Sequence, residues 1–343
     1  MKKRVTINDI AEIVKVSSTT VSKALTGKDR IGEDTRRLIL KTAEDLDYKA
    51  NKVAQSLKRK PINVGVVIED YFPDFSDNIV RGMEHVFEKL QDYKVEKIYS
   101  ILGMATDKKV VVEELKRVAS KGVDGIIFMP GKACLEYTEI VNEFKEKGIP
   151  VILMLSDLFN SNRIAVIRNN SRMVGDIGAQ ILGLLNNGKK NAMFIGNKDN
   201  TSHKDVIDGF VNRLKILDMD VVAVCETQND NTVGYYVADK LLKDNPLIDG
   251  IFVGTIHSEG ICRKIVEIGR AGKVKIVCTD VFPKVVEYIE NDVVQATIFQ
   301  DPFRQGKIAI EVMYSYLTEG VIPEPEIFIN PRIIIKSNCK DYI

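Results

Sequence analysis

Two different spacings of apolar residues divide the chain, and the change between them falls at Ile62. Before that residue, apolar positions recur every three or four residues, as they do on the buried face of a helix; Leu38, Ile39, Ala43 and Leu46 are an example. We expect helices over about 6–14, 17–25, 33–48 and 51–58, with Thr6, Ser17 and Asn51 as candidate N-caps.

Beyond Ile62 the pattern consists of short apolar runs of strand length, mostly separated by helical patterns of 10–17 residues. Strands that alternate with helices predict buried parallel sheets in a doubly wound α/β arrangement. The strands are too many for one compact sheet, so we expect two α/β lobes. The expected strands lie at 62–68, 94–100, 123–129, 149–155, 191–196, 220–225, 249–254, 273–279 and 293–299.

Charge separates the same two regions. The 343 residues carry a net charge of +1, but residues 1–60 hold 15 Lys and Arg against 8 Asp and Glu, a net of +7, so the remainder is at −6. A small basic region attached to a mildly acidic body suggests a module that binds a polyanion such as nucleic acid.

Other classes of protein find little support in the sequence. Five widely spaced cysteines without a CxxC pair predict free thiols in a reducing cytosol, and neither a signal peptide nor a membrane-length apolar run is visible, so we expect a cytoplasmic protein. The three histidines lack metal-ligand spacing, and no G-x-S-x-G nucleophile motif occurs. "GLLNNGKK" (183–190) lacks the Ser/Thr of a P-loop and follows a helical pattern. We therefore expect no catalytic site, cofactor or metal.

The stretch "VKVSSTTVSKAL" (14–25) places five hydroxyl residues at the start of an expected helix, although such residues are mediocre helix formers. Slim donors at a helix start suit the major groove of DNA, whose rims are lined with phosphates. Ser18, Thr19 and Lys23 lie opposite Val21 and Ala24 and are the best candidates to meet base edges. A solvated surface helix with a capping serine is the alternative, and this stretch alone does not decide between them.

Residues 5–68 carry five motifs in order: T-x-x-D-I-A, V-S-x-x-T-V-S-K-A-L, T-R, Y-x-x-N-x-V-A-x-S-L and G-V-V. Over this stretch of about 65 residues the chain resembles the head of the lactose-repressor (LacI) family of bacterial transcription regulators, and the rest resembles that family's effector domain more weakly. The resemblance implies an all-α helix-turn-helix head followed by a two-lobed, periplasmic-binding-protein-like body.

The resemblance also implies a set of DNA contacts. Positions 18, 19 and 23 would read bases, and residues 51–58 would form a hinge helix on operator binding. From each of two chains, Leu57 would then wedge open a base step in the minor groove of a palindromic operator, which requires a dimer; taken alone, Leu57 reads as an ordinary linker leucine. Ala50 stands where the family usually carries proline. The candidate DNA-binding residues are Thr6, Ser17, Ser18, Thr19, Thr20, Ser22, Lys23, Arg30, Tyr48, Asn51, Gln55 and Leu57.

The same resemblance implies boundaries within the chain. The helix-turn-helix domain would span 1–50 and the hinge 51–61, with the N-terminal lobe at 62–160 plus 292–320 and the C-terminal lobe at 161–291 plus 321–343. In the cleft, Phe75 would stack on a ligand while Asp280 and Gln300 bind it. The less favoured alternative for Asp280 is a loop or helix cap, whereas Phe75 reads equally as an interface or core aromatic.

The expected cleft departs from the family pattern. Val206 replaces a customary arginine, Thr255-Ile256 replaces an Asn-Asp pair, and Leu155-Ser156 replaces Asp-Arg. Sugar recognition depends on charged groups that meet pairs of hydroxyls, so an ordinary monosaccharide is in doubt. Arg168, Asn169 and Lys204 are candidates to supply polar groups instead. A sugar or related polar metabolite, an anionic or otherwise atypical ligand, and a body that mainly dimerises remain alternatives.

Together these features favour a dimeric, ligand-responsive repressor that binds double-stranded DNA, is not an enzyme and does not contact membranes. The chain lacks a leucine heptad tail for a tetramer. A solute-binding sensor without a DNA role and an α/β enzyme are the competing classes. The basic head opposes the first, and the missing catalytic residues oppose the second.

Overall fold

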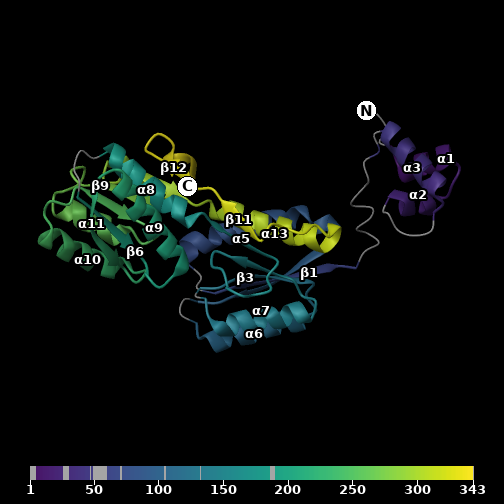
Figure 1. Cartoon of the computed structure of the whole chain (residues 1–343), viewed down its shortest axis with the longest axis horizontal. Coiled ribbons are helices and arrows are strands. Elements are labelled where there is room, and N and C mark those ends of the chain that lie inside the picture. Colours follow the sequence, from purple (N-terminus) through teal and green to yellow (C-terminus); the bar gives the residue numbers. More distant parts are fainter. Residues whose placement is uncertain are drawn as a thin grey trace. The chain divides into compact units, whose positions relative to one another are not determined.

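The computed structural model describes residues 5–25, 31–46, 48, 60–69, 72–103, 106–131, 133–185 and 190–342. The chain divides into two compact units, one of residues 1–61 with 90–95 and the other of residues 62–89 with 96–343 (Figure 1). The first contains the helical head expected from the sequence, and the second contains the α/β body.

The head contains three described helices, α1 (Ile7–Val14), α2 (Ser18–Leu25) and α3 (Glu33–Asp45). Ile10, Val21 and Ile39, one from each helix, are fully buried against one another. This core follows the apolar spacing of the sequence, because residues three or four positions apart share one face of a helix.

The expected caps of the first two helices are confirmed. Thr6 and Asp9 form a reciprocal capping box on α1. Ser17 precedes α2, and its Oγ accepts the Thr20 backbone N–H at 3.1 Å. Gly32, before α3, provides no side-chain cap.

The body contains two six-stranded sheets, which confirms the α/β fold class. The first sheet has the order β11-β5-β4-β3-β1-β2, and its described pairings are parallel. Helices α6 and α7 cover one face, and α5 and α13 cover the other (Figure 1). These elements are called the first lobe: β1 (Ile62–Ile68), α5 (Pro73–Lys89), β2 (Val95–Ile101), α6 (Lys108–Ser120), β3 (Gly125–Met129), α7 (Leu135–Glu146), β4 (Val151–Met154), β5 (Ala165–Asn169), α13 (Pro302–Glu319) and β11 (Glu326–Ile329). The short helix η1 (Gln91–Tyr93) lies between α5 and β2 in the chain.

The second sheet has the order β12-β10-β9-β8-β6-β7, and β12 is antiparallel to its neighbour β10. Apolar side chains of α8 and α9 pack on one face, and those of α10, α11 and α12 pack on the other. With the short C-terminal helix η2, these elements are the second lobe: α8 (Ser171–Leu185), β6 (Lys190–Ile195), α9 (Thr201–Ile216), β7 (Asp220–Glu226), α10 (Asn231–Asp244), β8 (Gly250–Val253), α11 (Glu259–Glu267), β9 (Lys275–Thr279), α12 (Pro283–Glu290), β10 (Ala296–Phe299), β12 (Arg332–Ile334) and η2 (Cys339–Tyr342).

All nine strands expected from apolar runs are present, while β5, β11 and β12 come in addition. The chain crosses between the lobes after β5, after β10 and after β11. The lobe boundaries expected near 160, 292 and 321 therefore need correction. Each falls before a strand that stays paired within its own sheet, so the crossovers lie near 170, 300 and 330.

Candidate functional site

Helix α2 of the head buries one side and exposes the other. Val21 and Ala24 are buried, while Ser18, Thr19 and Lys23 are exposed, so the division expected for this helix is present. Ser17 and Thr6 are exposed at the helix starts, and Thr20, Ser22 and Tyr48 are half-buried. The candidate DNA-binding residues Arg30, Asn51, Gln55 and Leu57 lie outside the described residues.

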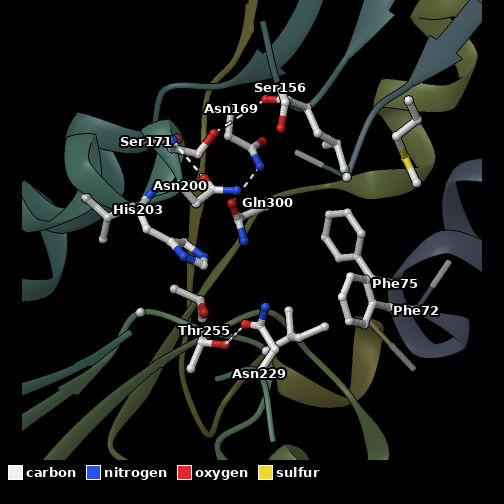
Figure 2. Close-up of a pocket in the computed structure, with 18 of the residues that line it drawn as sticks. Phe72, Phe75, Ser156, Asn169, Ser171, Asn200, His203, Asn229, Thr255 and Gln300 are labelled. Carbon is white, nitrogen blue, oxygen red and sulfur yellow. Dashed lines mark hydrogen bonds between the residues drawn. The ribbon is translucent and has the colours of Figure 1, made fainter. Parts of the chain in front are cut away.

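Within the α/β body, a cavity of about 200 Å³ lies between the two lobes (Figure 2). It sits at the carboxyl ends of the strands, where open parallel sheets usually bind ligands. Residues from both lobes line it: Glu69, Phe72, Phe75, Ser76, Met129, Pro130, Gly131, Leu155, Ser156, Asn169, Ser171, Val174, Asn200, Ser202, His203, Val206, Asn229, Gly254, Thr255, Ile256, Thr279 and Gln300.

One side of the cavity is aromatic. Figure 2 shows the Phe72 and Phe75 rings facing the polar side chains of Asn200 and His203. Both residues stand at the start of α5, where hydrogen bonds hold the backbone that carries the rings. The Phe72 N–H donates to Ser76 Oγ at 3.1 Å, and the Ser76 N–H donates to the Phe72 carbonyl oxygen at 2.7 Å. Phe75 lines the cavity, as the family resemblance implied, and its stacking on a ligand stays a prediction.

Side-chain amides form a continuous chain where two of the crossovers meet. The Asn169 amide donates to Gln300 Oε1 at 2.5 Å, and Gln305 Nε2 donates to Asn169 Oδ1 at 3.1 Å. Gln300 Nε2 donates in turn to Asp280 Oδ2 at 2.5 Å. These four residues, called the crossover network, join the β5–α8 crossover to the β10–α13 crossover.

Asp280 belongs to this network but does not line the cavity, which corrects the expectation that it faces a ligand. The Asp280 carboxylate already accepts two hydrogen bonds from Gln300. The Gln300 side-chain amide donates to Oδ2, and its backbone N–H donates to Oδ1 at 3.2 Å. Burial raises the pKa of Asp280 to about 7, although the hydrogen bonds from Gln300 act in the opposite direction. The carboxyl group thus supports Gln300, which does line the cavity.

The first turn of α9 forms another polar side of the cavity, and it was not expected from the sequence. Asn200 Oδ1 accepts the backbone N–H groups of Ser202 and His203 at 2.9 and 3.3 Å, so its amide NH₂ group is left for the cavity. His203 Nδ1 contacts the backbone of Asn197, and burial lowers the pKa of the imidazole. Asn200, Ser202 and His203 are called the α9 wall.

Two signals in the sequence could have identified this wall. Asn200 and Asn229 both lie in a short loop between an expected strand and a helix, which is where cleft residues of parallel sheets lie. Asn200 is also followed by Thr201 and Ser202 in a pattern typical of a helix N-terminus.

Arg168 and Lys204 do not line the cavity, and both expectations are corrected. Arg168 neighbours Asn169 on β5, and successive side chains of a strand point in opposite directions. It contacts Glu326 and Asp205 instead. Lys204 is exposed, because the helical period turns it away from the cavity while His203 and Val206 face it.

The charge of the cavity wall is low. Among the described residues that line it, none is Lys or Arg, and Glu69 is the one acidic side chain. Glu69 is buried, and its two carboxylate oxygens accept the Tyr137 hydroxyl at 2.8 Å and the Gly131 N–H at 3.0 Å. Its charge is thus already compensated by hydrogen bonds from the first lobe.

The described ranges offer neither a cluster of metal ligands nor a helix of membrane length and apolarity. Within them, no cluster of three or more His, Cys, Asp and Glu side chains could hold a metal ion. No helix of this part of the chain combines the length and the apolarity that a membrane crossing requires.

Known proteins resemble the chain over both units. The family described as "Bacterial regulatory proteins, lacI family" matches residues 6–51, and "Periplasmic binding protein domain" matches residues 64–320. Catabolite control protein A of Priestia megaterium is 31% identical over 256 residues, which are 73% of this chain and 74% of that protein. The protein of the same name from Staphylococcus aureus strain Mu50 is 23% identical over 344 residues, covering 98% and 99%.

The body also resembles solved structures. A solute-binding protein of an ABC transporter from Burkholderia graminis, in complex with D-arabinose, matches 82% of this chain and 98% of its own with a TM-score of 0.75 at 22% identity. This likeness shows the fold of the body. The family matches and the 31% identity to Catabolite control protein A show that the chain belongs to the lacI family of bacterial regulatory proteins, which are DNA-binding transcription regulators and not enzymes.

Proposed function

We propose that the chain is a dimeric, ligand-responsive repressor, acting in the cytoplasm, that binds a palindromic operator. The observation that carries this proposal is the exposed face of α2, where Ser18, Thr19 and Lys23 stand on a helix whose opposite face is buried. Short hydroxyl side chains let such a helix enter the major groove, and a lysine can donate to guanine acceptors. In this proposal Leu57 of each chain enters the minor groove between the two half-sites.

We propose further that the cavity of the body binds an uncharged small molecule. A phosphorylated or carboxylated ligand would need a cation, and the described lining offers none. Neutral amides, hydroxyls and an imidazole form the polar lining, and two phenyl rings offer an apolar surface. This argues against the anionic ligand considered from the sequence, and for a neutral sugar or a similar ring compound. The D-arabinose in the related solute-binding protein belongs to that class.

The DNA-binding proposal is tested by selecting inverted repeats of about 14–20 base pairs from a random pool and measuring mobility shifts with the full chain. We expect wild type to select a palindrome and Leu57→Ala to lose at least about tenfold in affinity, the equivalent of one lost base-step insertion. Ser18→Ala with Thr19→Ala should relax base preference while non-specific binding stays. A Leu57→Ala protein that bends and binds DNA as wild type does would refute the hinge assignment.

The ligand proposal is tested by thermal unfolding of the full chain with D-arabinose, D-glucose and glucose 6-phosphate as probes. Ligand at about 100 times its Kd adds roughly 2.7 kcal/mol to stability, so a true ligand raises the melting temperature clearly. We expect neutral compounds alone to do so, and mass spectrometry of small molecules released from the denatured protein to find an uncharged one. Stabilisation by the phosphate ester alone would contradict the proposal.

A further inference from the structure

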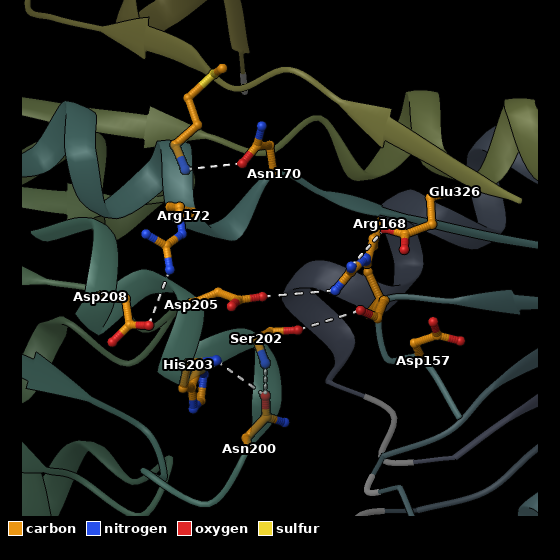
Figure 3. Close-up of polar contacts among 12 residues, drawn as sticks. Asp157, Arg168, Asn170, Arg172, Asn200, Ser202, His203, Asp205, Asp208 and Glu326 are labelled. Atoms are coloured by element: carbon orange, nitrogen blue, oxygen red, sulfur yellow. Dashed lines mark hydrogen bonds and ion pairs between the residues drawn. The ribbon is translucent and has the colours of Figure 1, made fainter. Parts of the chain in front are cut away.

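Arg168 has interaction partners in both lobes (Figure 3). In its own lobe, Nη2 lies 2.7 Å from Glu326 Oε2 on the neighbouring strand β11, and the guanidinium lies over the Phe328 ring at 5.2 Å from its centroid. In the second lobe, Asp205 of α9 places Oδ2 3.8 Å from Nη1. Two partners therefore hold Arg168 on the first lobe, and a third reaches it from the second.

A second contact crosses between the lobes close by, one helical turn earlier on α9. Ser202 Oγ donates to the Leu155 carbonyl oxygen at 3.4 Å, and both residues line the cavity. Leu155 follows β4 with a φ of 63°, a left-handed conformation that is costly for leucine and turns its carbonyl group out of the strand. The start of α9 is therefore at once a wall of the cavity and a contact surface between the lobes.

Helix α9 packs closely on α8 within the second lobe. It packs on α8 at backbone distance, because a Cβ atom on Gly175 would lie 1.9 Å from the Val206 carbonyl oxygen and one on Gly209 would lie 2.0 Å from that of Arg172. A change in the distance between the backbones at Arg168 and Asp205 therefore moves α8 together with α9.

We propose that Arg168 and Asp205 form a latch that holds the two lobes together beside the ligand and so regulates how readily the cavity opens; its consequence for DNA binding rests on the proposed function. The contact between Arg168 and Asp205 is weak enough to open. The distance of 3.8 Å exceeds that of a hydrogen bond, and 37% of the Asp205 side chain is exposed, so water replaces the contact easily. Arg168 keeps Glu326 and Phe328 when the lobes separate, so opening does not leave a buried cation unpaired.

The chain offers a matched control on the same helix. Asp208 lies one turn after Asp205, and its Oδ2 accepts from Arg172 Nη2 at 3.2 Å, but both residues belong to the second lobe (Figure 3). Asp205→Asn and Asp208→Asn therefore remove the same charge from neighbouring turns of α9. Only the first removes a contact between lobes.

The test measures the distance between the lobes in the full chain by pulsed electron paramagnetic resonance. Spin-labelled noncanonical residues at exposed positions 146 on α7 and 240 on α10 leave the native cysteines untouched. We expect Asp205→Asn to raise the ratio of long to short distances about two- to fivefold, the usual size of a partly exposed ion pair. Arg168→Gln should do the same, the double variant should add nothing, and Asp208→Asn should match wild type.

Equal distributions for wild type and Asp205→Asn, or equal shifts for Asp205→Asn and Asp208→Asn, would overturn the latch. Operator affinity of the same variants separates this result from the proposed function. A wild-type chain that selects no inverted repeat refutes the proposed function while the distance measurement still tests the latch. Normal operator binding without any effect of Asp205→Asn on the lobe distance refutes the latch alone.

Discussion

The crossover network and the α9 wall both supply polar groups to the same cavity, yet they are built in opposite ways. In the network, Asn169, Gln305 and Asp280 are buried, and each bonds to another member. On the α9 wall, Asn200 and His203 are half-buried, and each uses one end of its side chain to bond to the backbone of its own lobe. The other end is left for the cavity.

This difference separates the holding of the lobes from the recognition of a ligand. Buried polar groups that bond to one another fix the geometry of the crossovers. Replacing one of them leaves its partners without a hydrogen bond. Groups with one end committed are oriented but retain hydrogen-bonding capacity for a ligand. The network should therefore resist substitution strongly, whereas the α9 wall should tolerate it in stability and respond in binding.

The largest expected loss of stability comes from a substitution at the centre of the crossover network. Asn169→Leu removes the donor of Gln300 Oε1 and one of the two acceptors of Gln305 Nε2, which keeps the Gln300 carbonyl oxygen at 3.0 Å. Each buried group that loses a hydrogen bond in this way costs about 1–3 kcal/mol. We expect a loss of about 2–6 kcal/mol in the free energy of unfolding, measured by urea denaturation. A loss below about 0.5 kcal/mol, typical of a surface substitution, would show that the network does not hold the crossovers.

The next effect depends on pH and concerns Asp280. Its pKa is raised to about 7 in the folded chain but stays near 4 when unfolded, so the folded state binds the proton more tightly. The contribution of Asp280 to stability is therefore greatest below pH 4, falls as the pH rises from about 4 to about 7, and is lower by as much as about 4 kcal/mol above that.

Asp280→Asn should remove this dependence. Asparagine has the same shape and tolerates the φ of 64° at this position. We expect the unfolding free energy of the variant relative to wild type to rise between pH 5 and pH 7 in denaturant titrations and to level off by pH 8. A difference that stays constant over this range would mean that Asp280 is ionised throughout and that its burial is not what sets its pKa.

The fold could be read from the sequence because its signals are local. Apolar runs such as 62–68 and 249–254 become buried parallel strands, and the three-to-four spacing around Ile39 becomes the core of the head. Strands β11 and β12 were not expected from the sequence because they lie at sheet edges, where half or more of their positions are exposed. The segments "EIFI" and "RII" therefore do not form a run of buried apolar residues.

The cavity was only partly predictable, since its lining depends on which way each side chain points. Phe75 and Gln300 were found from the family resemblance, and Asn169 was one of three candidates to supply the polar groups that the family pattern lacks here. Arg168, the neighbour of Asn169, shows why the other expected residues do not line the cavity. A shift of one residue along a strand changes the face, so Arg168 reaches the other lobe while Asn169 faces the cavity.

The smallest expected effect sharpens the comparison on the α9 wall. Asn200→Ala removes the cap of α9 and should cost about 1 kcal/mol, whereas Asn200→Asp keeps an oxygen for the Ser202 and His203 N–H groups and should cost little. Both variants lose the amide NH₂ group that faces the cavity, so both should bind a neutral ligand such as the one released from wild type at least about tenfold more weakly. Urea denaturation separates the two variants, and calorimetry with the released compound groups them. If Asn200→Asp bound as wild type does, Asn200 would be a cap alone, and the spare capacity of the α9 wall would rest on His203.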